Sequence, residues 1–143
     1  MKHVYAGVSP ELMTDGDLKK EFKYIGRLPL YFLVRGKIYG RVPEKYVTGR
    51  RNKRFMLAHM GYCFDRYYDL LKEIGRRGMD AKPHPDRFQL VPADCFRVFR
   101  PTKDDIKASK EQLEHDMHFN YALYYRGERL NLYQALRKVR EEW

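Results

Sequence analysis

The spacing of apolar residues between Met56 and Ile74 is the feature that most limits how this chain can fold. Apolar side chains recur there at alternating steps of four and three, at Met56, Met60, Cys63, Tyr67, Leu70 and Ile74. This spacing places all of them on one face of an α-helix. Arg76, Arg77 and Gly78 follow, and cations and glycine favour the last turn and the C-terminal cap of a helix. We therefore predict one long amphipathic helix that ends close to Gly78.

Capping signals mark the beginning of an earlier helix. Thr14 can accept a hydrogen bond from the amide of Asp17, and acidic residues favour the positive end of a helix, so we predict a helix from Thr14 to about Ile25. A second helical stretch is expected over residues 28–34. Glycine and proline interrupt residues 35–54 and 79–99, which predicts a long basic loop and an irregular crossing.

The C-terminal third is predicted to contain two more helices. Thr102 and Asp105 can form a capping box, which opens a helix that continues towards Met117. A turn over residues 126–128 then leads to the last helix. The apolar side of that helix is formed by Leu132, Leu136, Val139 and Trp143.

Length and composition limit the chain to one ordered domain. A chain of 143 residues can bury a stable hydrophobic core without the help of disulfide bonds or a structural metal. This chain has no internal repeat and no interdomain linker. We predict a mainly α, compact single domain over residues 1–143, with residues 128–143 as a C-terminal helical extension. The apolar side of this extension is expected to dock on the domain or on a second copy, which would give a homodimer.

Several classes of site and location are excluded by the sequence. Cys63 and Cys95 lie in apolar runs without the spacing of metal ligands, which predicts buried free thiols in a reducing compartment. His115 and His118 are three residues apart but lack a third ligand, so no metal site and no cofactor are predicted. No apolar run reaches membrane-spanning length and no signal-peptide core is present. We therefore expect a cytoplasmic protein without a membrane partner, encoded by a cell or by a phage.

Positive charge is concentrated between Leu18 and Arg54. Twelve lysine and arginine residues accompany only two glutamates there, and the resulting +10 equals the formal net charge of the whole chain. Aromatic residues are interleaved with these cations. Such a surface suits a polyphosphate backbone, because each neutralised phosphate releases condensed counterions. We predict duplex DNA as the partner, with contacts from Lys19, Lys20, Lys23, Arg27, Arg50, Arg51, Lys53 and Arg54.

Alternatives to duplex DNA follow from the same composition. Cations and rings also suit single-stranded RNA, and a basic face can serve solubility alone. Charge by itself does not distinguish these partners.

Four segments of the chain resemble a known family in their order and spacing. They read ELMTDGDL over residues 11–18, EFKYIGR over 21–27, RYYDLLKEIGRRGM over 66–79 and YALYYRG over 121–127. Together they resemble the pyrimidine-dimer DNA glycosylase family, the family of phage endonuclease V, as far as Gly127. The resemblance implies a compact three-helix DNA-repair fold that binds duplex DNA and excises a damaged pyrimidine.

The resemblance also implies a chemistry, from which this chain departs at two places. In the family an N-terminal α-amine attacks the sugar C1′ to form a Schiff base, and a glutamate assists. The position of that glutamate is occupied here by Tyr24, and a phenol with a pKa of about 10 supplies no negative charge near neutral pH. The bulky Lys2 is expected to prevent removal of Met1, which displaces the amine by one residue.

The candidate catalytic residues are therefore Met1, Lys2, Glu21 and Tyr24. Glu21 lies one helical turn before Tyr24 and is the substitute carboxylate, and Lys2 is an alternative amine. Tyr24 is expected to be either a stacking residue at a distorted base step or a half-buried helix residue. His3 occupies a position that is basic in the family and is expected to contact phosphate.

The expected function is duplex-DNA binding within this family, in DNA repair or phage DNA metabolism, with catalysis weak or lost. One alternative is an active glycosylase or abasic lyase that acts on a different base through an N-terminal amine. Another alternative is a non-catalytic DNA-packaging or interaction protein.

Overall fold

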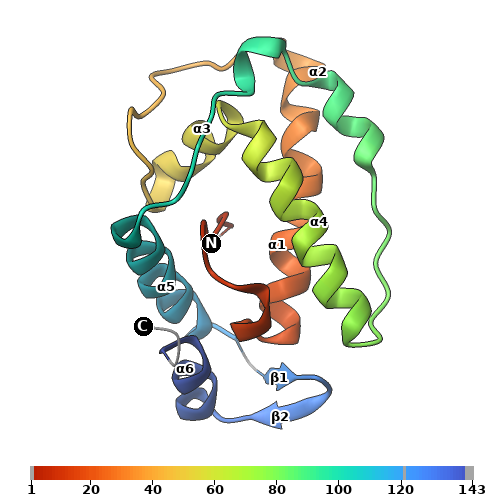
Figure 1. Cartoon of the computed structure of the whole chain (residues 1–143), viewed down its shortest axis with the longest axis vertical. Coiled ribbons are helices and arrows are strands. Elements are labelled where there is room, and N and C mark those ends of the chain that lie inside the picture. The colour runs from red at the N-terminus through yellow and green to blue at the C-terminus, as the bar shows by residue number, and fades with distance from the viewer. Residues whose placement is uncertain (1, 121, 141–143) are drawn as a thin grey trace.

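A computed structural model of the protein describes residues 2–120 and 122–140 (Figure 1). The elements in chain order are α1 (Asp15–Arg27), α2 (Tyr31–Arg35), α3 (Asn52–Leu57), α4 (Met60–Arg76), α5 (Lys103–Met117), β1 (Leu123–Tyr125), β2 (Glu128–Leu130) and α6 (Leu132–Arg140). The prediction of a mainly α protein is confirmed, since the two strands pair only with each other in the described residues. Figure 1 shows α1 and α4 side by side, α5 on the opposite flank, and the hairpin with α6 at one end.

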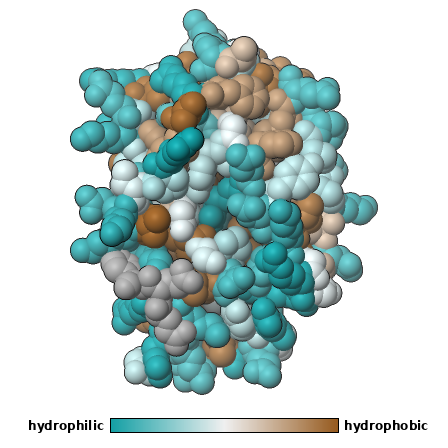
Figure 2. Space-filling model, viewed as in Figure 1, coloured by the Kyte–Doolittle hydropathy of each residue, from teal (hydrophilic) through white to brown (hydrophobic). Residues whose placement is uncertain are grey.

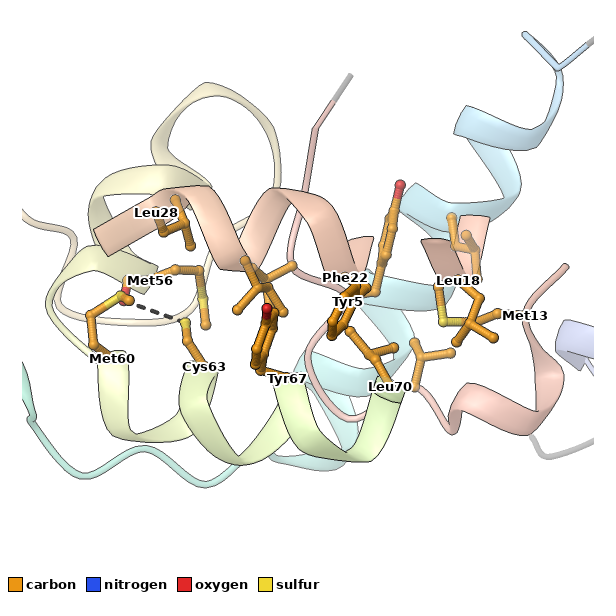
Figure 3. Close-up of a cluster of buried hydrophobic side chains, with 14 of the residues drawn as sticks. Tyr5, Met13, Leu18, Phe22, Leu28, Met56, Met60, Cys63, Tyr67 and Leu70 are labelled. Carbon is orange, nitrogen blue, oxygen red and sulfur yellow. Dashed lines mark hydrogen bonds between the residues drawn. The ribbon is translucent and has the colours of Figure 1, made fainter. Parts of the chain in front are cut away.

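The core lies mainly between α1 and α4, which pack antiparallel (Figure 3). Leu18, in the first turn of α1, lies near Leu70 in the second half of α4. The rings of Phe22 and Tyr67 stack with their centroids 4.3 Å apart. All the stripe residues between Met56 and Ile74 are buried, as their spacing predicts. Removing this apolar surface from water is the main stabilising contribution to such a core.

The stripe is divided between α3 and α4, so the prediction of a single long helix is wrong. Ala58 and His59 separate the two helices. The carbonyl of Ala58 accepts a hydrogen bond from the N–H of Arg97 at 3.1 Å, and His59 pairs with Phe96 in an isolated β-bridge. A distant part of the chain therefore meets the helix where it breaks, and helical periodicity carries no signal of such a contact.

Helix ends with local capping signals lie where the sequence predicts them. Thr14 Oγ1 accepts a hydrogen bond from the N–H of Asp17 at 3.2 Å at the beginning of α1. Both bonds of the capping box between Thr102 and Asp105 are present at the beginning of α5. Gly78 follows α4 with φ of 69°, a left-handed conformation that glycine adopts without a steric penalty.

The segments outside the long helices differ from the predictions mainly in where they begin and end. The helical stretch expected over residues 28–34 is a 3₁₀ turn followed by α2. The expected loop over residues 35–54 is shorter, because a 3₁₀ turn at Gly49–Arg51 leads directly into α3. We call residues 36–48 the basic loop. Residues 79–99, the crossing segment, contain two 3₁₀ turns and no strand beyond the bridge.

The C-terminal extension packs on the domain from which it emerges. Ala135 and Val139 of α6 are buried, and Leu132 and Leu136 are partly buried against the core. Trp143, the fourth expected member of the apolar side, lies outside the described residues. The described part of the apolar side is therefore covered within one chain, one of the two outcomes that the sequence allowed.

Residues 3–8, the N-terminal segment, run through the middle of the molecule without forming a strand (Figure 1). Side chains satisfy four successive N–H groups at distances from 2.8 to 3.4 Å: Asn52 bonds to Val4, Glu21 to Tyr5, Tyr46 to Ala6 and Tyr62 to Gly7. Buried backbone groups need partners, and a neighbouring strand usually supplies them. Here side chains from α1, the basic loop, α3 and α4 take that role.

The surface is polar over most of the face that Figure 1 presents. Figure 2 shows hydrophilic residues spread over this face, with hydrophobic residues gathered towards its upper end. Among residues 2–120 and 122–140, no helix combines the length and the apolar composition that a membrane span requires.

Candidate nucleic-acid interface

Cations at helical spacing line the exposed side of α1. Lys19, Lys23 and Arg27 follow one another at four-residue steps, which on a helix means one side and a rise of about 6 Å per step. The opposite side, which includes Leu18 and Ile25, is buried in the core. We call the three cations the α1 stripe. Amphipathic patterning fixes its orientation, since the apolar side can face only inward.

The positive charge between residues 18 and 54 is not neutralised by ion pairs with described acidic residues. In the part of the chain that the structure describes, the twelve lysine and arginine residues between 18 and 54 form no ion pair. The ion pairs involve cations outside this stretch, namely His3, Arg66, Arg76, Arg77 and Arg140. The α1 stripe and the basic loop therefore present their charge to solvent and to any polyanion.

A basic cleft lies on one side of the α1 stripe. Its volume is about 680 Å³, and it is bounded by α1, α4 and the crossing segment. The crossing segment contributes three basic side chains, and the only carboxylate among the lining residues comes from Asp80. Those three basic residues are Lys82, His84 and Arg87. These three residues are not among the contacts predicted from the sequence, because their signal is only a cluster of basic residues around two prolines.

A second hollow, the N-terminal pocket, lies on the other side of the stripe. Its volume is about 410 Å³, and it is lined by the N-terminal segment, α1 and the end of α5. Lys23 and Arg27 line both hollows, so the α1 stripe forms the wall between them. Lys20 also lines this pocket, and its Nζ donates a hydrogen bond to Asn120 Oδ1 at 2.8 Å.

Glu21 lies at the N-terminal pocket, but both of its carboxylate oxygens are occupied. Arg66 donates to Oε2 through Nε and to Oε1 through Nη2 at 2.8 Å, and the N–H of Tyr5 also donates to Oε2. Burial alone lowers the pKa of Arg66, but the charge of Glu21 outweighs it and the pKa lies above its usual value. The pair is buried and holds the N-terminal segment. Glu21 therefore has a structural task, in addition to the catalytic one proposed from the sequence.

Tyr24 and Lys2 also line the N-terminal pocket. Tyr24 is half-buried, and burial raises the pKa of its phenol above the usual value of 10.0, so the group is neutral at physiological pH. This is the environment expected for the half-buried helix residue. Lys2 is exposed at the mouth, and Met1, the other candidate amine, lies outside the described residues.

His3 differs from the expected surface contact because it is buried, with 2% of its surface exposed. Its Nε2 accepts a hydrogen bond from the N–H of Gly49 at 2.8 Å, and Nδ1 lies 3.6 Å from a carboxylate oxygen of Asp116. The same carboxylate accepts a hydrogen bond from the hydroxyl of Tyr5. Burial, followed by this hydrogen bond, raises the pKa of Tyr5 far above its usual value. His3 therefore lies in the wall of the N-terminal pocket with little surface exposed, and its expected contact with phosphate stays a prediction.

Asp17 completes the polar wall of the pocket. Its carboxylate accepts hydrogen bonds from Thr14 at 2.7 Å and from Asn120 at 3.1 Å. Burial raises its pKa, and these two hydrogen bonds oppose the shift only in part. Local sequence patterns do not identify Asn120 and Asp116 as neighbours of α1, because they are about a hundred residues away along the chain and only tertiary packing brings them close.

The remaining predicted contacts form a separate cationic area. Arg50 and Arg51 lie in the 3₁₀ turn that precedes α3, and Lys53 and Arg54 lie in its first turn, all exposed. They line neither the basic cleft nor the N-terminal pocket. A nucleic acid that contacts both areas would have to extend beyond α1.

No metal centre is evident in the residues that the structure describes, since no three histidine, cysteine or acidic side chains cluster there. Cys63 and Cys95 are buried free thiols, as the sequence predicts. Comparison with protein-family models found no matching family, and comparison with curated proteins found no match. Function is therefore inferred from the charge and geometry of the α1 stripe and its two hollows.

Proposed function

We propose that this protein binds duplex DNA through the α1 stripe. The observation that carries the proposal is the arrangement of Lys19, Lys23 and Arg27, which lie on one side of a helix, separate two hollows and form no ion pair with any described residue. Cations held on a rigid helix contact phosphates without sequence preference and fix the orientation of the protein on the duplex. The basic cleft adds Lys82 and Arg87 on one flank of the same surface.

Membership of the pyrimidine-dimer DNA glycosylase family is part of the same proposal, with a role in DNA repair or phage DNA metabolism. The segment resemblance supports it. Catalysis by this protein is proposed to be weak or lost, because Tyr24 is a neutral phenol and the carboxylate of Glu21 is held by Arg66. A positioned acid–base group typically contributes 10²–10⁴-fold, so its absence leaves binding without efficient excision.

The test is the dependence of binding on salt. Fluorescence anisotropy with a labelled duplex should give a log–log slope of about −5 if six phosphates are contacted. Lys23→Ala combined with Arg27→Ala should reduce the slope by about two and weaken binding to all sequences alike. The matched control is Lys103→Ala combined with Lys107→Ala, which should leave the slope unchanged. These two lysines are exposed and lie at the same four-residue spacing on α5. A slope near zero for the unmodified protein would exclude the proposal.

An abasic-site lyase is the second candidate, because Lys2 and Glu21 line one pocket beside the α1 stripe. Borohydride trapping on a duplex with an abasic site asks whether any amine forms a Schiff base. We expect negligible trapping by the unmodified protein and recovery in Tyr24→Glu combined with Lys2→Thr, which restores both family elements. Efficient trapping that Lys2→Arg or N-terminal acetylation abolishes would establish the lyase instead. Absence of trapping in every variant would favour a protein that only binds or packages DNA.

A further inference from the structure

The end of α2 exposes two large apolar side chains. Leu33 is 66% exposed and Val34 is 86% exposed, although both lie in a helix. The helix stops immediately afterwards at Gly36, which has a left-handed φ of 71°. We call residues 33–39 the α2 tip. An adjacent exposed apolar pair is costly in water, so a contact that covers it is a source of binding energy.

The α2 tip is held in place by its neighbours. Phe32 is buried in the core directly before the exposed pair. The N–H of Tyr39 donates to the hydroxyl of Tyr31 at 2.9 Å, which closes the turn. The guanidinium of Arg35 lies 5.8 Å from the ring centroid of Tyr31 and 5.3 Å from that of Tyr39, within the range of cation–π attraction. Leu33 and Val34 therefore project from a preorganised base.

Exposed cations follow the apolar pair closely along the chain. Arg35, Lys37 and Arg41 are exposed, and none of them forms an ion pair among the described residues. The tip also follows the α1 stripe closely along the chain, since Arg27 ends α1 and a single 3₁₀ turn separates it from α2. An exposed apolar pair followed by exposed cations is complementary to duplex DNA, in which stacked apolar bases lie between two anionic phosphate backbones.

We propose that the α2 tip inserts Leu33 and Val34 at a base step of the bound duplex and bends it. Proteins that insert apolar side chains between base pairs unstack the step and kink the duplex, while basic residues contact the flanking phosphates. Arg35 and Lys37 are placed for those flanking contacts. This inference rests on the proposed binding of duplex DNA through the α1 stripe. An anionic membrane surface fits less well, because α2 has only five residues and interfacial helices use a long apolar face.

The test compares Leu33→Ser combined with Val34→Ser against a matched control. Val98→Ser removes an equally exposed valine, also 86% exposed, from the crossing segment. Bending is measured by energy transfer between dyes at the two ends of a short duplex, and unstacking by the fluorescence of 2-aminopurine in that duplex. The unmodified protein and Val98→Ser should shorten the end-to-end distance and raise the 2-aminopurine signal. The double variant should lose both responses and keep the salt slope.

Affinity is expected to change by less than about threefold in the double variant, because the apolar area gained on insertion and the cost of unstacking offset each other. Circular dichroism checks that the helices are intact, which the exposure of both residues favours. A steep salt slope without bending or unstacking by the unmodified protein would overturn the insertion while leaving the binding proposal in place. A slope near zero would remove both proposals. The protein could instead sediment with anionic vesicles. If the double variant lost this sedimentation but kept the bending and unstacking of DNA, the tip would be assigned to a membrane surface and the insertion would be overturned.

Discussion

Residues 3–8 and residues 36–48 both lack helix and strand, but the first stretch is buried and the second is mostly exposed. In the N-terminal segment four successive N–H groups bond to side chains from other elements. In the basic loop, residues 40–45 make no hydrogen bond within the described part of the chain. Within one fold, backbone without helix or strand can therefore be held by many hydrogen bonds or by very few.

Arginine takes opposite roles in these two regions. Arg66 is buried, and it donates to Glu21 and to the carbonyl of Val8, so its charge is used to hold the fold. Arg41 in the basic loop is exposed without an ion pair among the described residues, so its charge is available to a partner. Lysine and arginine residues in a sequence therefore indicate a binding surface only after the buried arginines, whose charge holds the fold, have been excluded.

The largest expected effect comes from removing the buried arginine. Arg66→Met leaves the carboxylate of Glu21 buried without its counter-ion, which should lower the free energy of unfolding by about 3–5 kcal/mol. Urea denaturation followed by circular dichroism measures the change. Arg41→Met is the matched control in the basic loop and should change stability by less than about 0.5 kcal/mol.

A second variant keeps this prediction testable if the first does not fold. Arg66→Met combined with Glu21→Gln removes the unpaired charge and retains an acceptor for the N–H of Tyr5, so part of the lost stability should return. Equal destabilisation by Arg66→Met and Arg41→Met would contradict the distinction between the two regions.

Glycine substitutions should give the next largest effect. Gly7 has φ of 78°, and an added Cβ would lie 2.3 Å from Ile106 Cγ1. Gly7→Ala therefore combines left-handed strain with overpacking, and it should cost about 2–4 kcal/mol in thermal or urea unfolding. Gly36→Ala in the basic loop has a similar φ of 71° and open space around the Cβ, so only the strain of about 1 kcal/mol is expected. Equal losses from the two variants would mean that the N-terminal segment is not tightly packed.

The smallest effect concerns pH and the wall of the N-terminal pocket. Burial raises the pKa of Asp17 above 3.8, so the folded protein binds this proton more tightly than the unfolded chain does. The stabilising contribution is present below pH 3.8 and is lost as pH rises through the raised pKa. Asp17→Asn does not titrate, so its stability relative to the unmodified protein should increase between pH 4 and neutrality. Melting temperatures across this range measure the difference, and parallel curves would contradict the assignment.

The parts of the fold that depend on nearby residues could be predicted from the sequence. The N-cap hydrogen bond at Thr14 and the capping box at Thr102 join residues three positions apart, so their signal is complete in a short window. The break at His59 could not be predicted, because it coincides with a bridge to Phe96, 37 residues away. Periodicity describes the buried side of a helix and contains no information about which distant segment will cross it.

The candidate site also has one part that local sequence predicts and another that only tertiary packing creates. The α1 stripe could be predicted because helical spacing and charge are both local. The wall of the N-terminal pocket could not, since the hydrogen bond between Tyr5 and Asp116 joins residues 111 positions apart. The resemblance predicts a phosphate contact for His3 from its basic character, whereas its burial depends on packing that a pattern of single residues does not encode.

The way the N-terminal segment is held has a consequence for the order in which the protein assembles. The side chains that bond to its backbone lie between 16 and 58 positions further along the chain, at Glu21, Tyr46, Asn52, Tyr62 and Arg66. Contacts of large sequence separation form slowly, because the chain must first lose the entropy of closing long loops. During synthesis, the N-terminal segment must wait for α4 to emerge from the ribosome before these backbone bonds can form. The N-terminal segment is thus among the last parts of the fold to reach its final structure.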